Sequence, residues 1–158
     1  MTDHTQNPSP HLSNAEGDVS AYGFDTQELK MLALCRRLFE AMSGQDQQVW
    51  AAAYRLAGQQ YGDGGAERIL GYTIDVIEAM RALRSSPFIY GRDGCACCRN
   101  KLTQEERLLI ASFHNMRRGK RSRAYVQAML LVEGRDPARL LVALEMLDFA
   151  LFEGREAG

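Results

Sequence analysis

Apolar residues recur every three or four positions from residue 25 to residue 153, and this period is interrupted once, between residues 87 and 102. Such a period places apolar side chains on one face of an α-helix, whereas a half-buried strand alternates them every second residue. The chain is 46% hydrophobic and 25% charged, a balance typical of a compact globular domain. We therefore predict an all-α fold, a bundle of about six helices with an irregular cysteine-containing loop between helices 3 and 4.

Turn residues and N-cap residues divide the periodic part of the chain into six segments. The predicted helices cover residues 26–42, 46–60, 66–83, 103–117, 122–132 and 137–153. The expected N-caps of three of them are Asp25 or Thr26, Ser122, and Asp136, because a short polar side chain can accept a bond from a free backbone N–H. Thr103 and Glu106 form a capping box at a fourth helix. Cys35 falls on the apolar stripe of the first helix and is expected in the core.

The first 23 residues have a different composition from the rest. They are rich in Asn, Ser and Pro, and they carry Asp3, Glu16 and Asp18 but no Lys or Arg. A segment with so few large apolar groups cannot offset the entropy of ordering itself. We therefore expect a disordered acidic tail over 1–23 and a single helical domain over 24–158. No apolar run approaches the roughly 18 residues of a membrane span, and the start resembles no signal peptide, so we expect a cytoplasmic protein without membrane contact.

Three of the four cysteines cluster where the helical period fails. Cys95, Cys97 and Cys98 contain both a C-x-C and a C-x-x-C spacing. Cytosolic thiols stay reduced, so such a cluster indicates metal or redox chemistry and not a structural disulfide. A C-x-x-C pair is half of a structural zinc site, because a tight turn directs two thiolates at one ion. We predict that these three cysteines bind zinc, with His114 as the candidate for the missing ligand.

The sequence is also compatible with three other interpretations of the cysteine cluster. An iron–sulfur cluster is an alternative cofactor, although one chain would normally supply four thiolates for it. A thiol redox pair is the one enzymatic alternative, although such motifs usually follow a strand. The cysteines can also be incidental, and His114 an ordinary surface histidine. The chain holds no phosphate loop, nucleophile elbow, zinc-protease or dinucleotide motif, so we expect a role without catalysis.

Positive charge is concentrated in one part of a chain whose net charge is only −1. Residues 92–123 contain nine cationic and three acidic residues. The densest part consists of Arg117, Arg118, Lys120, Arg121 and Arg123. We predict that these five side chains bind an anionic partner, either nucleic acid through its phosphates or an acidic protein. The acidic tail of the same chain is an equally compatible partner, and simple solvation of the five charges is the plainest alternative.

The last predicted helix is apolar on most of its sides. Its polar strip consists of Arg139, Glu145 and Asp148. A helix of this kind lies either at the centre of a bundle or under another subunit, so we expect a homo-oligomer. The combined prediction is a small regulatory or adaptor protein whose metal-binding loop positions a basic surface. The alternative is a helical homo-oligomeric interaction module with incidental cysteines.

Overall fold

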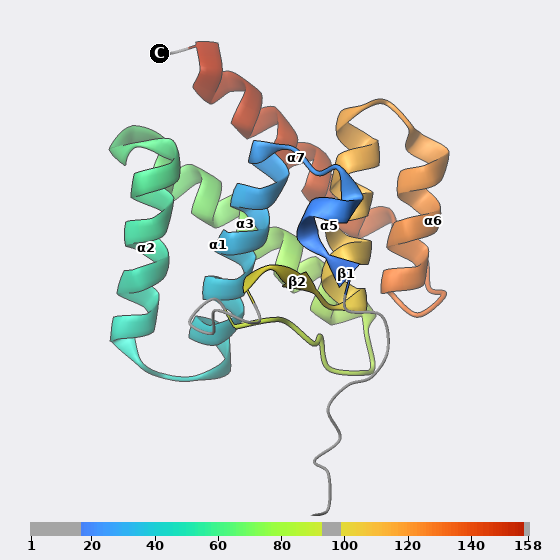
Figure 1. Cartoon of the computed structure of the whole chain (residues 1–158), viewed down its shortest axis with the longest axis horizontal. Helices are drawn as coiled ribbons and strands as arrows, with labels where there is room; N and C mark the ends of the chain where they lie inside the picture. Colours follow the sequence, from blue (N-terminus) through green and yellow to red (C-terminus); the bar gives the residue numbers. More distant parts are fainter. Residues whose placement is uncertain (1–16, 93–98, 157–158) are drawn as a thin grey trace, which may run out of the picture.

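The computed structural model describes residues 17–92 and 99–156. Within these ranges the chain is all-α, with six helices packed as a bundle, which confirms the predicted fold class (Figure 1). The helices are α1 Thr26–Ser43, α2 Gln47–Tyr61, α3 Asp63–Leu83, α5 Gln104–Arg117, α6 Arg121–Leu131 and α7 Ala138–Glu156. None of the helices in the described part of the chain combines the length and the apolarity needed to cross a bilayer.

Residues 17–22, which the composition assigns to the tail, belong to the fold. They form the short strand β1 (Gly17–Asp18) and a 3-10 helix (Val19–Tyr22). Strand β1 pairs antiparallel with β2 (Lys101–Leu102), with Gly17 opposite Leu102. The predicted tail over residues 1–16 lies outside the described residues. The segment 17–22 is therefore attached to the fold through β2, which directly precedes α5.

Three of the predicted N-caps are present in the structure. Asp25 accepts a bond from the Glu28 N–H and forms a capping box with it. Thr103 and Glu106 form the second capping box at α5. Asp136 accepts a bond of 3.0 Å from the N–H at the start of α7.

The predicted cap at Ser122 is wrong, because α6 already begins at Arg121. Lys120 occupies the N-cap position and supplies no side-chain bond to the helix. Gly119 has a left-handed backbone with φ of 69°, and the Lys120 N–H bonds to the Asn115 carbonyl at 2.9 Å. This tight turn ends α5 and leaves only three residues before α6. Helix α6 therefore begins at Arg121, before the position that a cap at Ser122 would give.

The core lies where α1, α3, α5 and α7 meet. Fully buried side chains from these four helices include Leu34, Leu38, Ile77, Met80, Ile110, Phe113, Leu140 and Leu144. The outer helices α2 and α6 approach through small residues, which permit close packing: Ala53 and Ala57 of α2, and Ala124 and Ala128 of α6. Cys35 is buried in the core, as predicted. Burial, with a further contribution from the Glu106 charge, raises the pKa of its thiol to about 12, so Cys35 stays protonated.

Candidate functional site

One buried ion pair joins α1 to α5, the helix that follows the cysteine segment in the chain. Arg36 of α1 and Glu106 of α5 are separated by 70 residues, and each side chain is only 2% exposed. The guanidinium donates two parallel bonds, from Nε to Oε1 at 2.7 Å and from Nη2 to Oε2 at 2.9 Å. This is the bidentate geometry in which arginine binds a carboxylate most strongly.

The same two side chains bind the backbone on both sides of residues 93–98. Arg36 donates to the carbonyls of Arg99 at 3.0 Å and Lys101 at 2.6 Å. Glu106 accepts from the N–H of Gly91 at 2.8 Å. A Cβ at Gly91 would lie 2.9 Å from Nη2 of Arg36, so a larger residue there would displace the Arg36 guanidinium. We call Arg36 and Glu106 the loop clamp, because they hold the chain before and after the cysteine segment.

Sequence reasoning assigned Glu106 to capping alone and missed Arg36. The signal was present: Arg36 lies at helical spacing from Leu32 and Phe39, inside the apolar stripe of α1. An arginine on an apolar stripe needs a partner, because a buried unpaired charge is strongly unfavourable. Its partner Glu106 lies 70 residues away in the sequence. The apolar period within one helix does not predict which residue of another helix it will contact.

The predicted zinc ligands Cys95, Cys97 and Cys98 lie outside the described residues. Within the described ranges, no group of three or more His, Cys, Asp or Glu side chains is arranged to hold a metal ion. Zinc binding therefore stays a prediction, and the structure adds to it the clamp that fixes both ends of the segment.

His114 lies on α5 beside Glu28 and Phe24. Its Nδ1 lies 3.0 Å from Oε2 of Glu28, and its ring meets that of Phe24 edge-on with centroids 5.6 Å apart. His114 follows Glu106 by two helical turns, or about 12 Å along α5. Ligation of a metal by His114 stays a prediction, and Nε2 is the ring nitrogen that the Glu28 contact leaves for it.

Two of the predicted anion-binding residues, Arg117 and Arg118, bind carboxylates of the same chain. Arg117 donates from Nη1 to both oxygens of Asp25, at 2.9 and 2.8 Å, and from Nε to Asp148 at 3.2 Å. Arg118 donates to Oε1 of Glu28 at 2.6 Å. These bonds attach the end of α5 to the start of α1 and to α7. We call the group formed by Asp25, Glu28, His114, Arg117 and Arg118 the charge cluster.

The charge cluster keeps its carboxylates ionised. Burial by itself would raise the pKa of Glu28, but hydrogen bonds from His114, from the Asp25 N–H and from Arg118 outweigh it, and the pKa falls below the ordinary 4.5. Asp25 behaves in the same way, because burial is outweighed by the Glu28 N–H and by Arg117, and its pKa lies below 3.8. The contacts of Arg117 and Arg118 with Asp25 and Glu28 are therefore true ion pairs at neutral pH, with a structural role.

The other three predicted anion-binding residues lie on the surface. Lys120, Arg121 and Arg123 are exposed at the start of α6, and the Arg121 side chain, 85% exposed, has Glu145 at 3.4 Å. The first turn of α6 holds no acidic residue and no side-chain cap. Cations at a helix N-terminus oppose its dipole, so helix stability does not explain this placement. These three residues form what we call the basic turn.

A second surface feature is apolar and lies on α7. This helix buries Leu140, Leu144, Leu147 and Leu151 on one side. On the other side Val142, Met146, Phe149 and Phe152 are 59%, 43%, 55% and 57% exposed. The prediction left α7 either central or covered by a subunit, and the structure excludes a central position.

Helix α6 extends the apolar surface of α7. Tyr125 and Val126 are 43% and 47% exposed and line, with Val142, a groove of about 630 Å³ between the two helices. On the other side of α7, Met146 and Tyr72 line a smaller groove of about 390 Å³ against α3. We call the surface made by Tyr125, Val126, Val142, Met146, Phe149 and Phe152 the α6–α7 face.

No family model, curated protein or solved structure matches this chain. The features of this chain that bear on its function are therefore the loop clamp, the charge cluster, the basic turn and the α6–α7 face.

Proposed function

We propose that the protein is a helical interaction module that pairs with a second copy of itself through the α6–α7 face. The observation that carries this proposal is the alignment of Val142, Met146, Phe149 and Phe152 on one side of α7, each more than two fifths exposed. Monomeric proteins seldom leave a contiguous apolar patch of this kind in water, and larger patches usually mark a binding surface.

The order of side-chain sizes along α7 fits a second copy. In an antiparallel pair of α7 helices with the two-fold axis between Met146 and Phe149, these two residues face each other across the interface. Val142 then lies within about one residue of the position opposite the larger Phe152, so the smallest of the four side chains meets one of the largest. A closed two-fold contact uses the same patch on both copies, which prevents open-ended association.

The borders of the face also suit a protein interface. Arg121 and Glu145 form an exposed ion pair beside Val142, with 3.4 Å between the charged groups. Stable interfaces combine an apolar centre with a polar rim of this type. The grooves on either side of α7 offer space for side chains of the partner copy.

Phe149→Glu is expected to convert the dimer into a monomer. Burying an unpaired carboxylate in an apolar interface should weaken self-association at least about 100-fold, or ~2.8 kcal/mol. Because Phe149 is 55% exposed in the single chain, the helix content and the melting temperature should change little. Size-exclusion chromatography with light scattering measures the mass of both proteins over a concentration series.

The matched control is Tyr54→Glu. Tyr54 is 52% exposed on α2, and Figure 1 shows α2 and α6 on opposite sides of the bundle. This variant should keep the mass of the unmodified protein at every concentration. A Phe149→Glu protein that dimerises as tightly as the parent would rule out the α6–α7 face as the interface.

A second candidate function is a metal-dependent regulatory or adaptor role, and the loop clamp favours it. We propose that Cys95, Cys97 and Cys98 bind zinc, with an iron–sulfur cluster as the alternative, and that α5 connects this site to the basic turn. A buried ion pair seldom stabilises a fold more than two apolar side chains would. We therefore assign to the Arg36–Glu106 pair the role of positioning the backbone. Here it positions the backbone on both sides of the cysteines. The basic turn would then bind an anionic macromolecule, such as nucleic acid or an acidic protein.

Elemental analysis of purified, reduced protein tests this second function. We expect about one equivalent of zinc per chain, as for a single structural site, and its loss in a Cys95→Ser/Cys98→Ser variant. Cys35→Ala is the control, because it removes a thiol from the core and should leave the metal in place. Iron with acid-labile sulfide would support the iron–sulfur alternative. Protein without bound metal would contradict both.

A further inference from the structure

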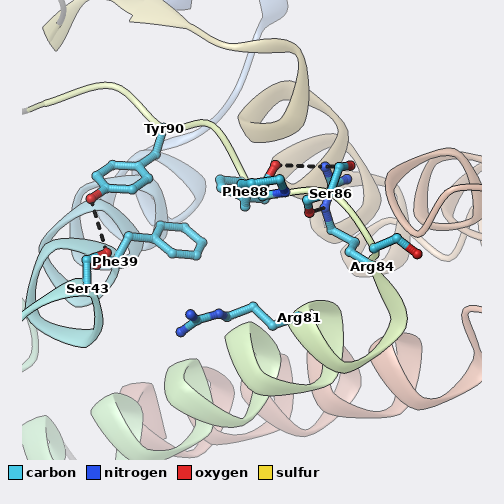
Figure 2. Close-up of a pocket in the computed structure, with 9 residues that line it drawn as sticks. Phe39, Ser43, Arg81, Arg84, Ser86, Phe88 and Tyr90 are labelled. Carbon is cyan, nitrogen blue, oxygen red and sulfur yellow. Dashed lines mark hydrogen bonds between the residues drawn. The ribbon is translucent and has the colours of Figure 1, made fainter.

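A cavity of about 360 Å³ lies between α1, the end of α3 and the chain that follows α3. It is separate from the α6–α7 face. We call it the aromatic cavity, and the residues that matter for its chemistry are Phe39, Ser43, Arg81, Ser86, Phe88 and Tyr90 (Figure 2). Its volume lies within the range of about 300–1,000 Å³ that small-molecule sites occupy.

Aromatic rings form one side of the cavity. Phe39 is buried, and its ring stacks on Phe88 with centroids 4.4 Å apart and on Tyr90 with centroids 5.2 Å apart. The planes of each pair lie within 19° of each other, so the three rings form a nearly parallel set. Such a set offers ring faces and edges to another planar apolar group.

Two arginines line the cavity, and they differ in their bonding. The Arg84 side chain is only 6% exposed and donates to the carbonyl of Pro87 at 3.2 Å and to that of Leu131. Its guanidinium therefore belongs to the structure. The Arg81 guanidinium makes no hydrogen bond or ion pair with another residue in the described ranges.

The described lining of the cavity also supplies no counter-charge to Arg81. Figure 2 shows Arg81 extending from α3 toward the side on which Phe39 and Tyr90 lie. Among the described residues that line the cavity there is no Asp or Glu. As far as the described lining residues go, the cavity thus combines aromatic walls with one cation that has no acidic partner.

We propose that the aromatic cavity binds a small aromatic carboxylate. The Arg81 guanidinium donates two parallel N–H bonds to the carboxylate, and the ring of the ligand packs against Phe88 and Tyr90. The Ser43 hydroxyl donates to the Phe39 carbonyl at 2.6 Å and lies 3.5 Å from the Tyr90 hydroxyl, so the oxygens of this pair are placed to accept a bond from a donor on the ring of the ligand. An anion without a ring, or a ring without a charge, satisfies only part of the site.

Titration of isotope-labelled protein with 2-naphthoate, followed by NMR, tests this proposal. We expect saturable shifts of residues 84–90 and binding about tenfold weaker in Arg81→Gln, the factor that 1.4 kcal/mol represents. Uncharged 2-naphthylmethanol should bind both proteins weakly and equally. Arg81 is exposed and unpaired with described residues, so its replacement should leave the fold intact.

Arg55→Gln is the matched control, an exposed arginine on α2 that does not line the cavity. It should bind 2-naphthoate as the unmodified protein does. Equal affinity of the Arg81→Gln and Arg55→Gln proteins would overturn the proposal. So would shifts confined to the α6–α7 face, or a titration without saturable shifts.

Discussion

Arg36→Met is expected to lower the free energy of unfolding by about 3–5 kcal/mol, because it leaves the Glu106 carboxylate buried without its counter-charge. The carbonyls of Arg99 and Lys101 also lose the donors that Arg36 supplies. Urea unfolding followed by circular dichroism gives the change in free energy. We expect this to be the most destabilising replacement of a charged residue in the described part of the chain.

The neighbouring arginine provides the control for this effect. Arg37 has a side chain that is 36% exposed, and it pairs with Glu40 at 3.8 Å on the same helix. Arg37→Met should change the free energy of unfolding by no more than about 0.5 kcal/mol. Arg36→Met/Glu106→Leu should be less destabilised than Arg36→Met alone, since it buries no single charge. Equal free energies of unfolding of the Arg36→Met and Arg37→Met proteins would show that the loop clamp does not stabilise the fold.

Glu28→Gln should lower the free energy of unfolding at pH 7 by about 1.5–3 kcal/mol, the usual contribution of hydrogen bonds to charged groups. The variant leaves Arg117 and Arg118 with a neutral partner in place of a carboxylate. The difference should also depend on pH. Since the folded pKa of Glu28 lies below the ordinary 4.5, the contribution of the carboxylate is complete above that value. It is lost as the pH falls from there through the folded pKa.

Chemical unfolding of Glu28→Gln and of the unmodified protein between pH 7 and pH 2 measures this change. The two stabilities should converge in acid, because the unmodified protein loses the same charge there. Glu40→Gln serves as control, since Glu40 makes only a 3.8 Å pair with the partly exposed Arg37 on its own helix. A Glu28→Gln deficit that stays constant down to the lowest pH would show that the ion pairs are not its cause.

The local features of this fold were predictable from the sequence. Asp25, Thr103 and Asp136 cap the helices that they were expected to cap, because capping depends on a few neighbouring residues. The predicted cap at Ser122 is wrong because the turn at Gly119 is short and α6 already begins at Arg121. Periodicity also places Cys35 in the core, where the structure has it.

The pairing of charges between helices was not predictable in the same way. Arg36 and Glu106 are 70 residues apart, and Glu28 and His114 are 86 apart. A periodic pattern shows which face of a helix is buried, but not which helix covers it. Arg117 and Arg118 were therefore expected on an open surface, whereas the packing of α5 against α1 gives both of them carboxylate partners.

The exposed side of α7 is a second feature that the periodic pattern could not predict. A helix that is apolar on most sides can be surrounded within its own bundle or by another subunit. The choice depends on how many helices the chain can place around it. In the structure α3, α5 and α6 contact α7, and the side with Val142 and Phe149 stays open. That open side is the basis of the proposed self-association.

Sedimentation equilibrium of the unmodified chain at several concentrations tests self-association most directly. The mass of the single chain is 17.7 kDa, and the proposal predicts a rise to twice this value with no larger species. A mass that stays at 17.7 kDa throughout the micromolar range would contradict it.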